Sequence, residues 1–290
     1  MKKIWMSVLI FKIKEIENLE RNKMDKKRVL TTVIYFPLVI IIILLNKPIL
    51  IDILISVVAI RAFYEFTNCA KNKNYKIISW IGYIYAILIA FRQFININLE
   101  YIIYLLLLTV TVLFSHVIIS NGKIKFEDIA YTLFGLIYII GFSVFIPIIY
   151  SLENGKLLIW FVFFAAWGTD TFAYLIGKRF GKHKFSKISP NKSIEGCIGG
   201  TIGSLIIISL YVLYLNTNYN LELNYLIIGI MSFVLSVIGQ IGDFSASVIK
   251  RHFEVKDFSN LFPGHGGMID RIDSVIFIAP FAYFFITNLL

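Results

Sequence analysis

Long apolar runs, separated by short polar loops, set the pattern of this 290-residue chain. Each run is long enough for a membrane-spanning helix, which needs about 20 apolar residues. Strands are disfavoured because the runs are continuous, and because backbone groups in lipid must bond within a segment or in a closed barrel. We predict an all-α fold, a polytopic transmembrane helical bundle with about nine helices, near residues 29–46, 49–67, 77–95, 101–120, 129–150, 157–176, 197–215, 225–249 and 271–290.

Composition and charge agree with this interpretation. Hydrophobic residues make up 58% of the chain and charged residues 16%, whereas a soluble domain has roughly 25% charged residues. The mean hydropathy is +0.78. The net charge of +10 is concentrated in the leader and in the second, fourth, sixth and eighth of the loops that join the nine predicted helices in chain order. Positive loops stay in the cytoplasm. We therefore predict a cytoplasmic N-terminus. No stripe of interleaved aromatic and basic residues supports nucleic-acid binding.

The chain divides into three predicted parts: a basic leader (1–28), N-terminal transmembrane scaffold helices (29–150) and a C-terminal transmembrane catalytic region (151–290). The leader is either an interfacial amphipathic helix or an upstream extension, because Met24 opens an ordinary start; we favour the extension. Nearly all unusual intramembrane charges follow Trp167, which places the chemistry in the third part. Cys69 and Cys197 lack CxxC spacing, so we expect two reduced cysteines.

Three features of the predicted helices have structural explanations. Arg61 and Glu65 lie four residues apart, as expected for an intrahelical ion pair. His116 stands near a helix end, where a hydrogen-bonded histidine is a simpler interpretation than a proton relay. Glycines in pairs spaced by four favour close helix packing over a phosphate-binding loop, which would precede a helix; they are Gly196, Gly199, Gly200 and Gly203.

Four acids are predicted to meet at one depth. Asp170 and Asp243 precede the basic ends of their helices by about eight and seven residues, which at 1.5 Å per residue is roughly 10 to 12 Å. Asp270 and Asp273 open the last helix from the same side and, three residues apart, share one face. Ionised acids in such a pocket repel one another, and a divalent cation would relieve that repulsion.

Each acid also has a structural explanation. Asp270 and Asp273 could cap the last helix, and Asp243 could pair with Lys250 or Arg251. For one acid alone, these alternatives are about as good as a catalytic role; the four together favour a metal site. Mg²⁺ suits carboxylates combined with phosphate oxygens, whereas zinc is disfavoured because the nearby histidines lack partners at ligand spacing.

Cations surround the acids in the sixth and eighth loops. Positive-inside topology explains many of them, but phosphoryl-transfer chemistry also needs cations beside a metal pocket. The turn at residues 263–267, PGHGG, permits positive φ and could offer backbone N–H groups to a phosphate. The cations are Lys178, Arg179, Lys182, His183, Lys184, Lys187, Lys192, Lys250, Arg251, Lys256 and Arg271.

Two motifs in the C-terminal part carry a family resemblance. Residues 247–273 read S-V-I-K-R-x4-K-D-F-S-N-L-F-P-G-H-G-G-M-I-D-R-I-D, which resembles the C-terminal signature of phosphatidate cytidylyltransferases, also called CDP-diacylglycerol synthases. Residues 170–174, DTFAY, with GK at 177–178, GKH at 181–183 and SPNKSIEG at 189–196, resemble the family's preceding loop. Asn191 and Ser193 stand where the family usually has lysine and threonine.

The resemblance implies that CTP condenses with phosphatidic acid to give CDP-diacylglycerol and pyrophosphate. It implies Mg²⁺, with or without a second, monovalent cation, a homodimer, and a multi-pass protein of a bacterial inner membrane with a cytoplasmic active site. The catalytic residues would be Asp243, Asp270, Lys250, Arg271 and Asp273, with Asp243 and Asp270 holding the metal. Substrate would be bound by Asp170, Lys178, Ser189, Lys192, Ser193, Glu195, Arg251, Lys256, Asp257, His265, Gly266 and Gly267.

Two other classes of membrane protein remain compatible with the sequence. A CTP-dependent polyprenol or dolichol kinase would share the nucleotide and the metal but would transfer the γ-phosphate to an alcohol. A cation-coupled transporter would also carry intramembrane acids. The chain lacks repeat symmetry and matching interrupted helices, which disfavours the transporter.

Overall fold

The computed structural model describes residues 37, 39–95, 99–186, 189, 192–262, 264 and 266–290. The leader lies outside these residues, and so does half of the first predicted helix (29–46), of which residues 37 and 39–44 are helical. Elsewhere in the described chain, the regular structure is helical, apart from two isolated bridges that pair Lys184 with Ser193 and Phe262 with Gly266. The predicted all-α fold is confirmed.

The N-terminal helices are α2 (Pro48–Lys71), α3 (Ser79–Ala90) and α4 (Leu99–Ile119), with a 3₁₀ turn, η1 (Arg92–Phe94), after α3. The predicted span at 77–95 was too long, because α3 has only 12 residues, or about 18 Å of helix. The chain turns where Arg92 and Gln93 reach back to the buried Asp52 of α2. Arg92 Nε lies 3.1 Å from Asp52 Oδ1, and Gln93 Nε2 donates to the other oxygen.

The next segment is continuous but irregular. It comprises α5 (Phe126–Gly135), a π-helical turn η2 (Leu136–Gly141) and α6 (Phe145–Tyr150). Together these cover the predicted span at 129–150.

The C-terminal helices are α7 (Gly155–Leu158), α8 (Trp160–Phe180), α9 (Ile194–Tyr219), α10 (Tyr225–His252) and α11 (Ile269–Asn288). They match the last four predicted spans. The glycines of α9 confirm the packing prediction, because α8 lies directly against them. An added Cβ would come within 2.7 Å of the Thr169 carbonyl oxygen at Gly200 and within 2.2 Å of the Phe172 ring at Gly203.

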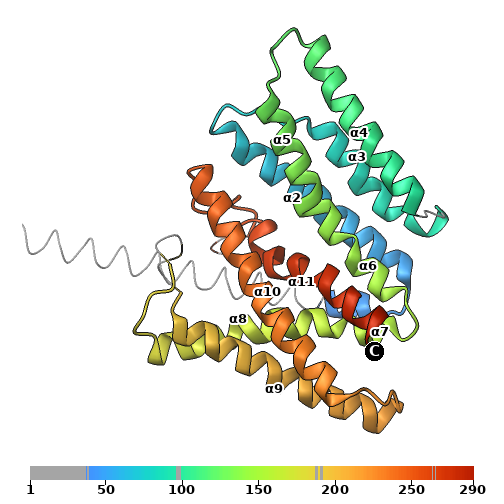
Figure 1. Cartoon of the computed structure of the whole chain (residues 1–290), viewed down its shortest axis with the longest axis vertical. Coiled ribbons are helices and arrows are strands. Elements are labelled where there is room, and N and C mark those ends of the chain that lie inside the picture. The colour runs from blue at the N-terminus through green and yellow to red at the C-terminus, as the bar shows by residue number, and fades with distance from the viewer. Residues whose placement is uncertain are drawn as a thin grey trace, which may run out of the picture.

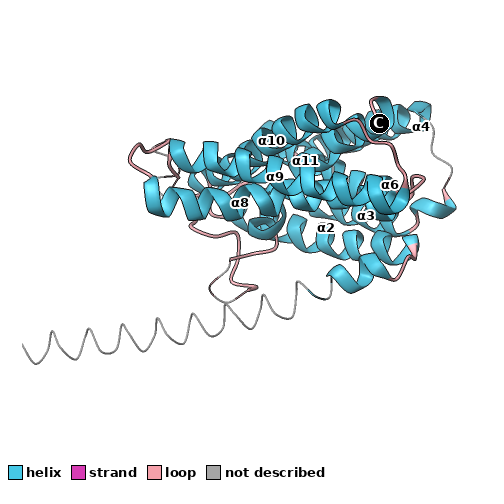
Figure 2. Ribbon diagram, turned by 90° about the horizontal axis from the view of Figure 1, so that it is seen from below, coloured by secondary structure: helices cyan, strands magenta, loops and turns pink. Residues whose placement is uncertain are grey.

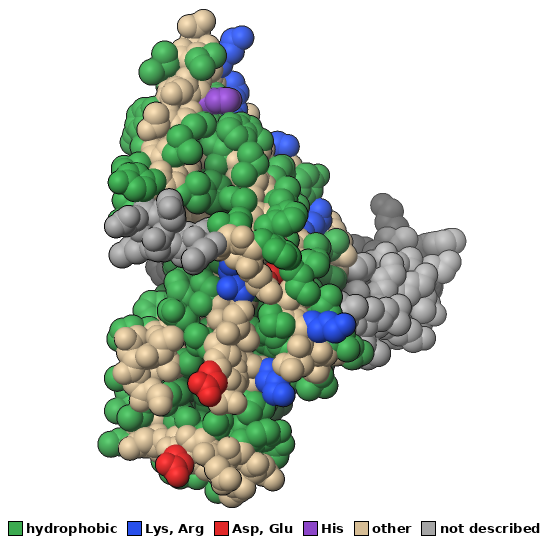
Figure 3. Space-filling view, turned by 90° about the vertical axis from the view of Figure 1, so that its right-hand side faces the viewer, with side chains coloured by type: hydrophobic (Ala, Val, Ile, Leu, Met, Phe, Trp, Pro, Cys, Tyr) green, Lys and Arg blue, Asp and Glu red, His purple; other side chains and the backbone are tan. Residues whose placement is uncertain are grey.

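Four segments of the described chain are long and apolar enough to cross a membrane: Phe126–Tyr150, Gly155–Phe180, Ile194–Tyr219 and Tyr225–His252. Large hydrophobic side chains also cover much of the surface, as the face in Figure 3 shows. Leu226 is 75% exposed and Ile119 is 78% exposed. Soluble proteins rarely expose such continuous apolar surface, so the chain is an integral membrane protein.

The helices form two groups, α2–α6 and α8–α11 (Figures 1 and 2). Helix α11 packs against α10 and α8 of its own group and also against α2 and α6 of the other. The first residues of α11 therefore lie where both groups can contact them.

Three of the predicted cytoplasmic loops meet at one end of the bundle. Lys73, after α2, forms an ion pair with Glu254, after α10. Lys76, in the same loop as Lys73, donates through Nζ to the Lys123 carbonyl oxygen at 3.0 Å. The second, fourth and eighth loops therefore lie on one side, as the alternation of positive charge requires.

Candidate active site

Three of the four predicted acids come together from three helices. Asp170 comes from α8, Asp243 from α10 and Asp273 from α11, and they lie close enough for their charges to repel. Ser274 links two of them: its Oγ lies 3.4 Å from Asp170 Oδ2 and 3.5 Å from Asp273 Oδ1. The approach of α10 to α11 depends on Gly242, where a Cβ would lie 2.7 Å from the Asp273 carbonyl oxygen.

Asp243 forms an ion pair with Lys192, and not with Lys250 or Arg251, the partners considered from sequence. Both side chains remain partly accessible, at 29% and 25% exposure. Lys192 Nζ also lies 4.2 Å from the centre of the Phe244 ring. The sixth loop thus brings a cation directly to the carboxylate cluster.

The fourth acid, Asp270, has a different environment. Its Oδ1 lies 2.6 Å from Lys250 Nζ. Its Oδ2 accepts hydrogen bonds from the backbone N–H groups of Phe258 at 3.0 Å and Gly267 at 2.8 Å. The side chain is 5% exposed. Asp270 therefore holds Lys250 and bonds to the α10–α11 loop near its middle, at Phe258, and near its end, at Gly267. The Gly267 N–H predicted to meet a phosphate bonds to this carboxylate instead.

The start of α9 is organised by two predicted binding residues. Ser193 is the N-cap, and its Oγ accepts from the Gly196 N–H at 3.1 Å. Glu195 accepts from the backbone N–H groups of Lys182 and His183, both at 3.2 Å, and contacts His183 Nδ1 at 2.6 Å. Glu195 thereby holds the sixth loop against the start of α9, and Lys192 of that loop lies beside the site.

The other predicted site residues have varied positions. Lys178, Arg251, Lys256, Asp257 and Arg271 are exposed, Ser189 is half-buried, and Gly266 and Gly267 are buried. His265 lies outside the described residues.

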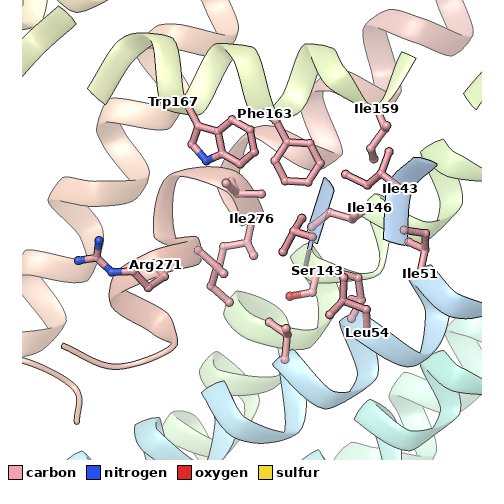
Figure 4. Close-up of a pocket in the computed structure, with 15 residues that line it drawn as sticks. Ile43, Ile51, Leu54, Ser143, Ile146, Ile159, Phe163, Trp167, Arg271 and Ile276 are labelled. Atoms are coloured by element: carbon pink, nitrogen blue, oxygen red, sulfur yellow. The ribbon is translucent and has the colours of Figure 1, made fainter. Parts of the chain in front are cut away.

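An apolar pocket adjoins the site (Figure 4). It lies between the helical residues 39–44, α2, α6, α8 and α11, and Phe163 and Trp167 of α8 form one wall. Ser143 and Arg271 are its polar lining residues. Arg271 belongs to the same helical turn as Asp270 and Asp273, so the pocket begins beside the charged groups. The pocket could not be predicted from the sequence, because its lining comes from helical segments far apart in the chain.

The carboxylates of the site are the candidate ligands for the predicted Mg²⁺. Within the described residues, no three or more His, Cys, Asp or Glu side chains are already arranged to hold a metal ion. The carboxylates of Asp170, Asp243 and Asp273 are nevertheless hard oxygen donors of the kind that Mg²⁺ prefers. The donor set fits Mg²⁺, and the predicted pair of ligands, Asp243 and Asp270, stays a prediction.

The known proteins that are similar to this chain point to one family. The model of the cytidylyltransferase family matches residues 26–289. A phosphatidate cytidylyltransferase of Staphylococcus aureus is 35% identical over 258 residues, which cover 88% of this chain and 96% of that protein. One of Staphylococcus haemolyticus is 41% identical over 58% of this chain and 63% of that protein, and one of Bacillus subtilis is 36% identical over 61% and 65%. The resemblance of the two C-terminal motifs is thereby confirmed, and the chain belongs to the cytidylyltransferase family.

Proposed function

We propose that this chain is a CTP:phosphatidate cytidylyltransferase, which makes CDP-diacylglycerol and pyrophosphate for phospholipid biosynthesis. The structural observation that carries this proposal is the meeting of Asp170, Asp243 and Asp273 with Lys192 at one site. Carboxylates beside cations suit a reaction that moves charge among phosphate oxygens. The similarity to proteins named phosphatidate cytidylyltransferase supports the same activity.

The reaction needs no covalent nucleophile from the protein. A phosphate oxygen of phosphatidic acid attacks the α-phosphorus of CTP, and the bond from that phosphorus to the bridging oxygen breaks. Pyrophosphate leaves with the electron pair. The protein contributes positioning and electrostatic stabilisation, which Lys192, Lys250 and Arg271 can supply around the carboxylates. Mg²⁺, held by Asp243 and its neighbouring carboxylates, would neutralise phosphate oxygens.

The lipid substrate suits the surroundings of Arg271. Its guanidinium can bind a phosphate headgroup bidentately, and the apolar pocket beside it can receive part of an acyl chain. We place the site at the cytoplasmic face of a multi-pass protein, because it lies close to the joined basic loops. The predicted homodimer and the second cation stay predictions.

Label position in the product tests the activity. Purified protein would be given phosphatidic acid, Mg²⁺ and CTP labelled separately at the α or the γ phosphate. We expect α label in the lipid and γ label in pyrophosphate. Label from the γ position in the lipid would establish a kinase instead, and absence of transfer to any phospholipid would reopen the transporter.

A further inference from the structure

The loop between α10 and α11 is held by a second carboxylate besides Asp270. This is Glu65 of α2, which lies more than 190 positions away in the sequence. Glu65 Oε1 accepts a hydrogen bond from Ser259 Oγ at 2.6 Å, and Oε2 accepts one from the Ile269 N–H at 3.1 Å. The middle of the loop, at Ser259, and the first residue of α11, Ile269, thus bond to one side chain of the N-terminal helices.

The ion pair with Arg61 does not account for this placement. Arg61 Nε lies 3.2 Å from Glu65 Oε1, as the spacing predicted, but the arginine side chain is 32% exposed whereas that of the glutamate is fully buried. An acid that only balanced a neighbouring arginine could remain at the surface with it. Burial of a carboxylate is costly unless hydrogen bonds compensate, and the loop provides those bonds.

The glycines of the loop fit between the two carboxylates. A Cβ on Gly267 would lie 2.3 Å from Glu65 Oε2, and a Cβ on Gly266 would lie 2.6 Å from Asp270 Oδ2. Gly266 also has a φ of +80°, which side chains with a Cβ rarely adopt. Glu65 therefore leaves no room for a side chain at Gly267, and Asp270 leaves none at Gly266.

Contacts continue along the same side of α2. Cys69, one turn after Glu65, is 4% exposed, and its Sγ donates to the Phe258 carbonyl oxygen at 3.3 Å. Lys73 then pairs with Glu254. Phe258 is the residue whose N–H bonds to Asp270 Oδ2, so α2 bonds to its carbonyl oxygen and Asp270 to its N–H.

We infer that Glu65 is a positioning residue for catalysis: it fixes the α10–α11 loop so that Asp270 can hold Lys250 at the site. This inference rests on the proposed function for its kinetic consequence, but the loop contact can be measured without any activity. Residues Ser259 and Ile269 transmit the effect, because they bond to Glu65 and flank the groups that bond to Asp270.

The kinetic test compares two buried acids of the same helix. Asp52 lies near the other end of α2, is fully buried, and pairs with Arg92. We expect Glu65→Ala to lower kcat/KM about 10- to 100-fold, because two loop donors lose their acceptor. Asp52→Ala should stay within about threefold of wild type at a comparable loss of thermal stability, since its partners lie away from the site. Glu65→Gln should lie between the parent and Glu65→Ala, because its amide oxygen can still accept from Ile269 whereas its NH2 group faces the Arg61 Nε–H donor.

The structural test uses the two cysteines of the chain. In a Cys197→Ser background, Cys69 is the one remaining thiol, and the loop covers it. We expect a maleimide to label Cys69 at least about tenfold faster in Glu65→Ala than in the parent, because loop release exposes the thiol, and at the parental rate in Asp52→Ala. An unchanged labelling rate in Glu65→Ala, or equal kinetic losses in the two alanine variants, would overturn the inference. Faster labelling in a protein that transfers no cytidylyl group in any form would leave loop positioning intact and refute the proposed function.

Discussion

Lys250 Nζ lies 2.6 Å from Asp270 Oδ1, and the two side chains are 16% and 5% exposed. Removal of either partner leaves a nearly buried charge alone, which is strongly unfavourable. We expect Lys250→Met and Asp270→Asn each to lower kcat about 100-fold or more, and the double variant to be no worse than the poorer single one, because paired groups act as a unit. Losses that multiply in a double-mutant cycle would show that the two residues act independently.

Asp243 is predicted to be required for turnover and dispensable for folding. Its ion pair with Lys192 is partly exposed, and such pairs contribute little to stability. Asp243→Asn should therefore reduce kcat by about 100- to 1000-fold with a nearly unchanged Tm in detergent. Glu222→Gln, an exposed acid in the loop between α9 and α10, is the control and should be fully active. Near-normal activity of Asp243→Asn would exclude the proposed role.

Chelation of divalent cations should abolish activity reversibly. Mg²⁺ neutralises phosphate oxygens that the lysines alone cannot fully balance. After EDTA treatment, the activity of the wild type should return when Mg²⁺ is added. The Asp273→Asn variant should need a higher Mg²⁺ concentration for the same fractional recovery. Full activity in the presence of excess EDTA would contradict the metal prediction.

The apolar pocket beside Arg271 should influence the choice of lipid. Leu54 of α2 lines the pocket, so Leu54→Phe would occupy space intended for an acyl chain. We expect kcat/KM for long-chain phosphatidic acid to fall about fivefold, with a smaller change for a short-chain substrate, because the added ring atoms would take space that only a long chain fills. The neighbouring Ile53, 46% exposed, supplies the matched control Ile53→Phe. Equal effects on long and short chains would place the lipid elsewhere.

Close packing of α8 on α9 predicts a sharp contrast between two glycines. At Gly203 an added Cβ would lie 2.2 Å from the Phe172 ring, whereas Gly229 has nothing within 4 Å of that position. Gly203→Ala should lower the free energy of unfolding by about 1–3 kcal/mol, and Gly229→Ala should leave it unchanged or raise it slightly. Thermal unfolding in one detergent would compare the two variants, and similar Tm values would contradict close packing of α8 on α9.

The sequence predicted the depth of the site in the membrane but not the ion-pair partner of Asp243. Counting residues from the basic helix ends placed Asp170 and Asp243 at a common level, because a helix has a fixed rise. The partner of Asp243 was missed because Lys192 reaches it through the fold of the sixth loop, which local spacing does not specify.

The two other discrepancies have the same origin in tertiary contacts. The predicted span at 77–95 was too long because Asp52 of another helix captures Arg92. The i, i+4 spacing predicted Arg61 as the partner of Glu65 within the same helix, so nothing in the sequence indicated a partner elsewhere. Its bonds to Ser259 and Ile269 depend on contacts across most of the chain, and no periodic pattern encodes them.

The Arg61–Glu65 pair also bears on how the protein is made. Ser259 and Ile269 follow Glu65 by 194 and 204 positions in the chain, so α2 is synthesised before the residues that will donate to Glu65. An arginine one turn away on the same helix is present from the outset and lowers the cost of carrying that charge into the membrane. Arg61 thus supplies Glu65 with a counterion from its own helix until α10, α11 and the loop between them have been synthesised.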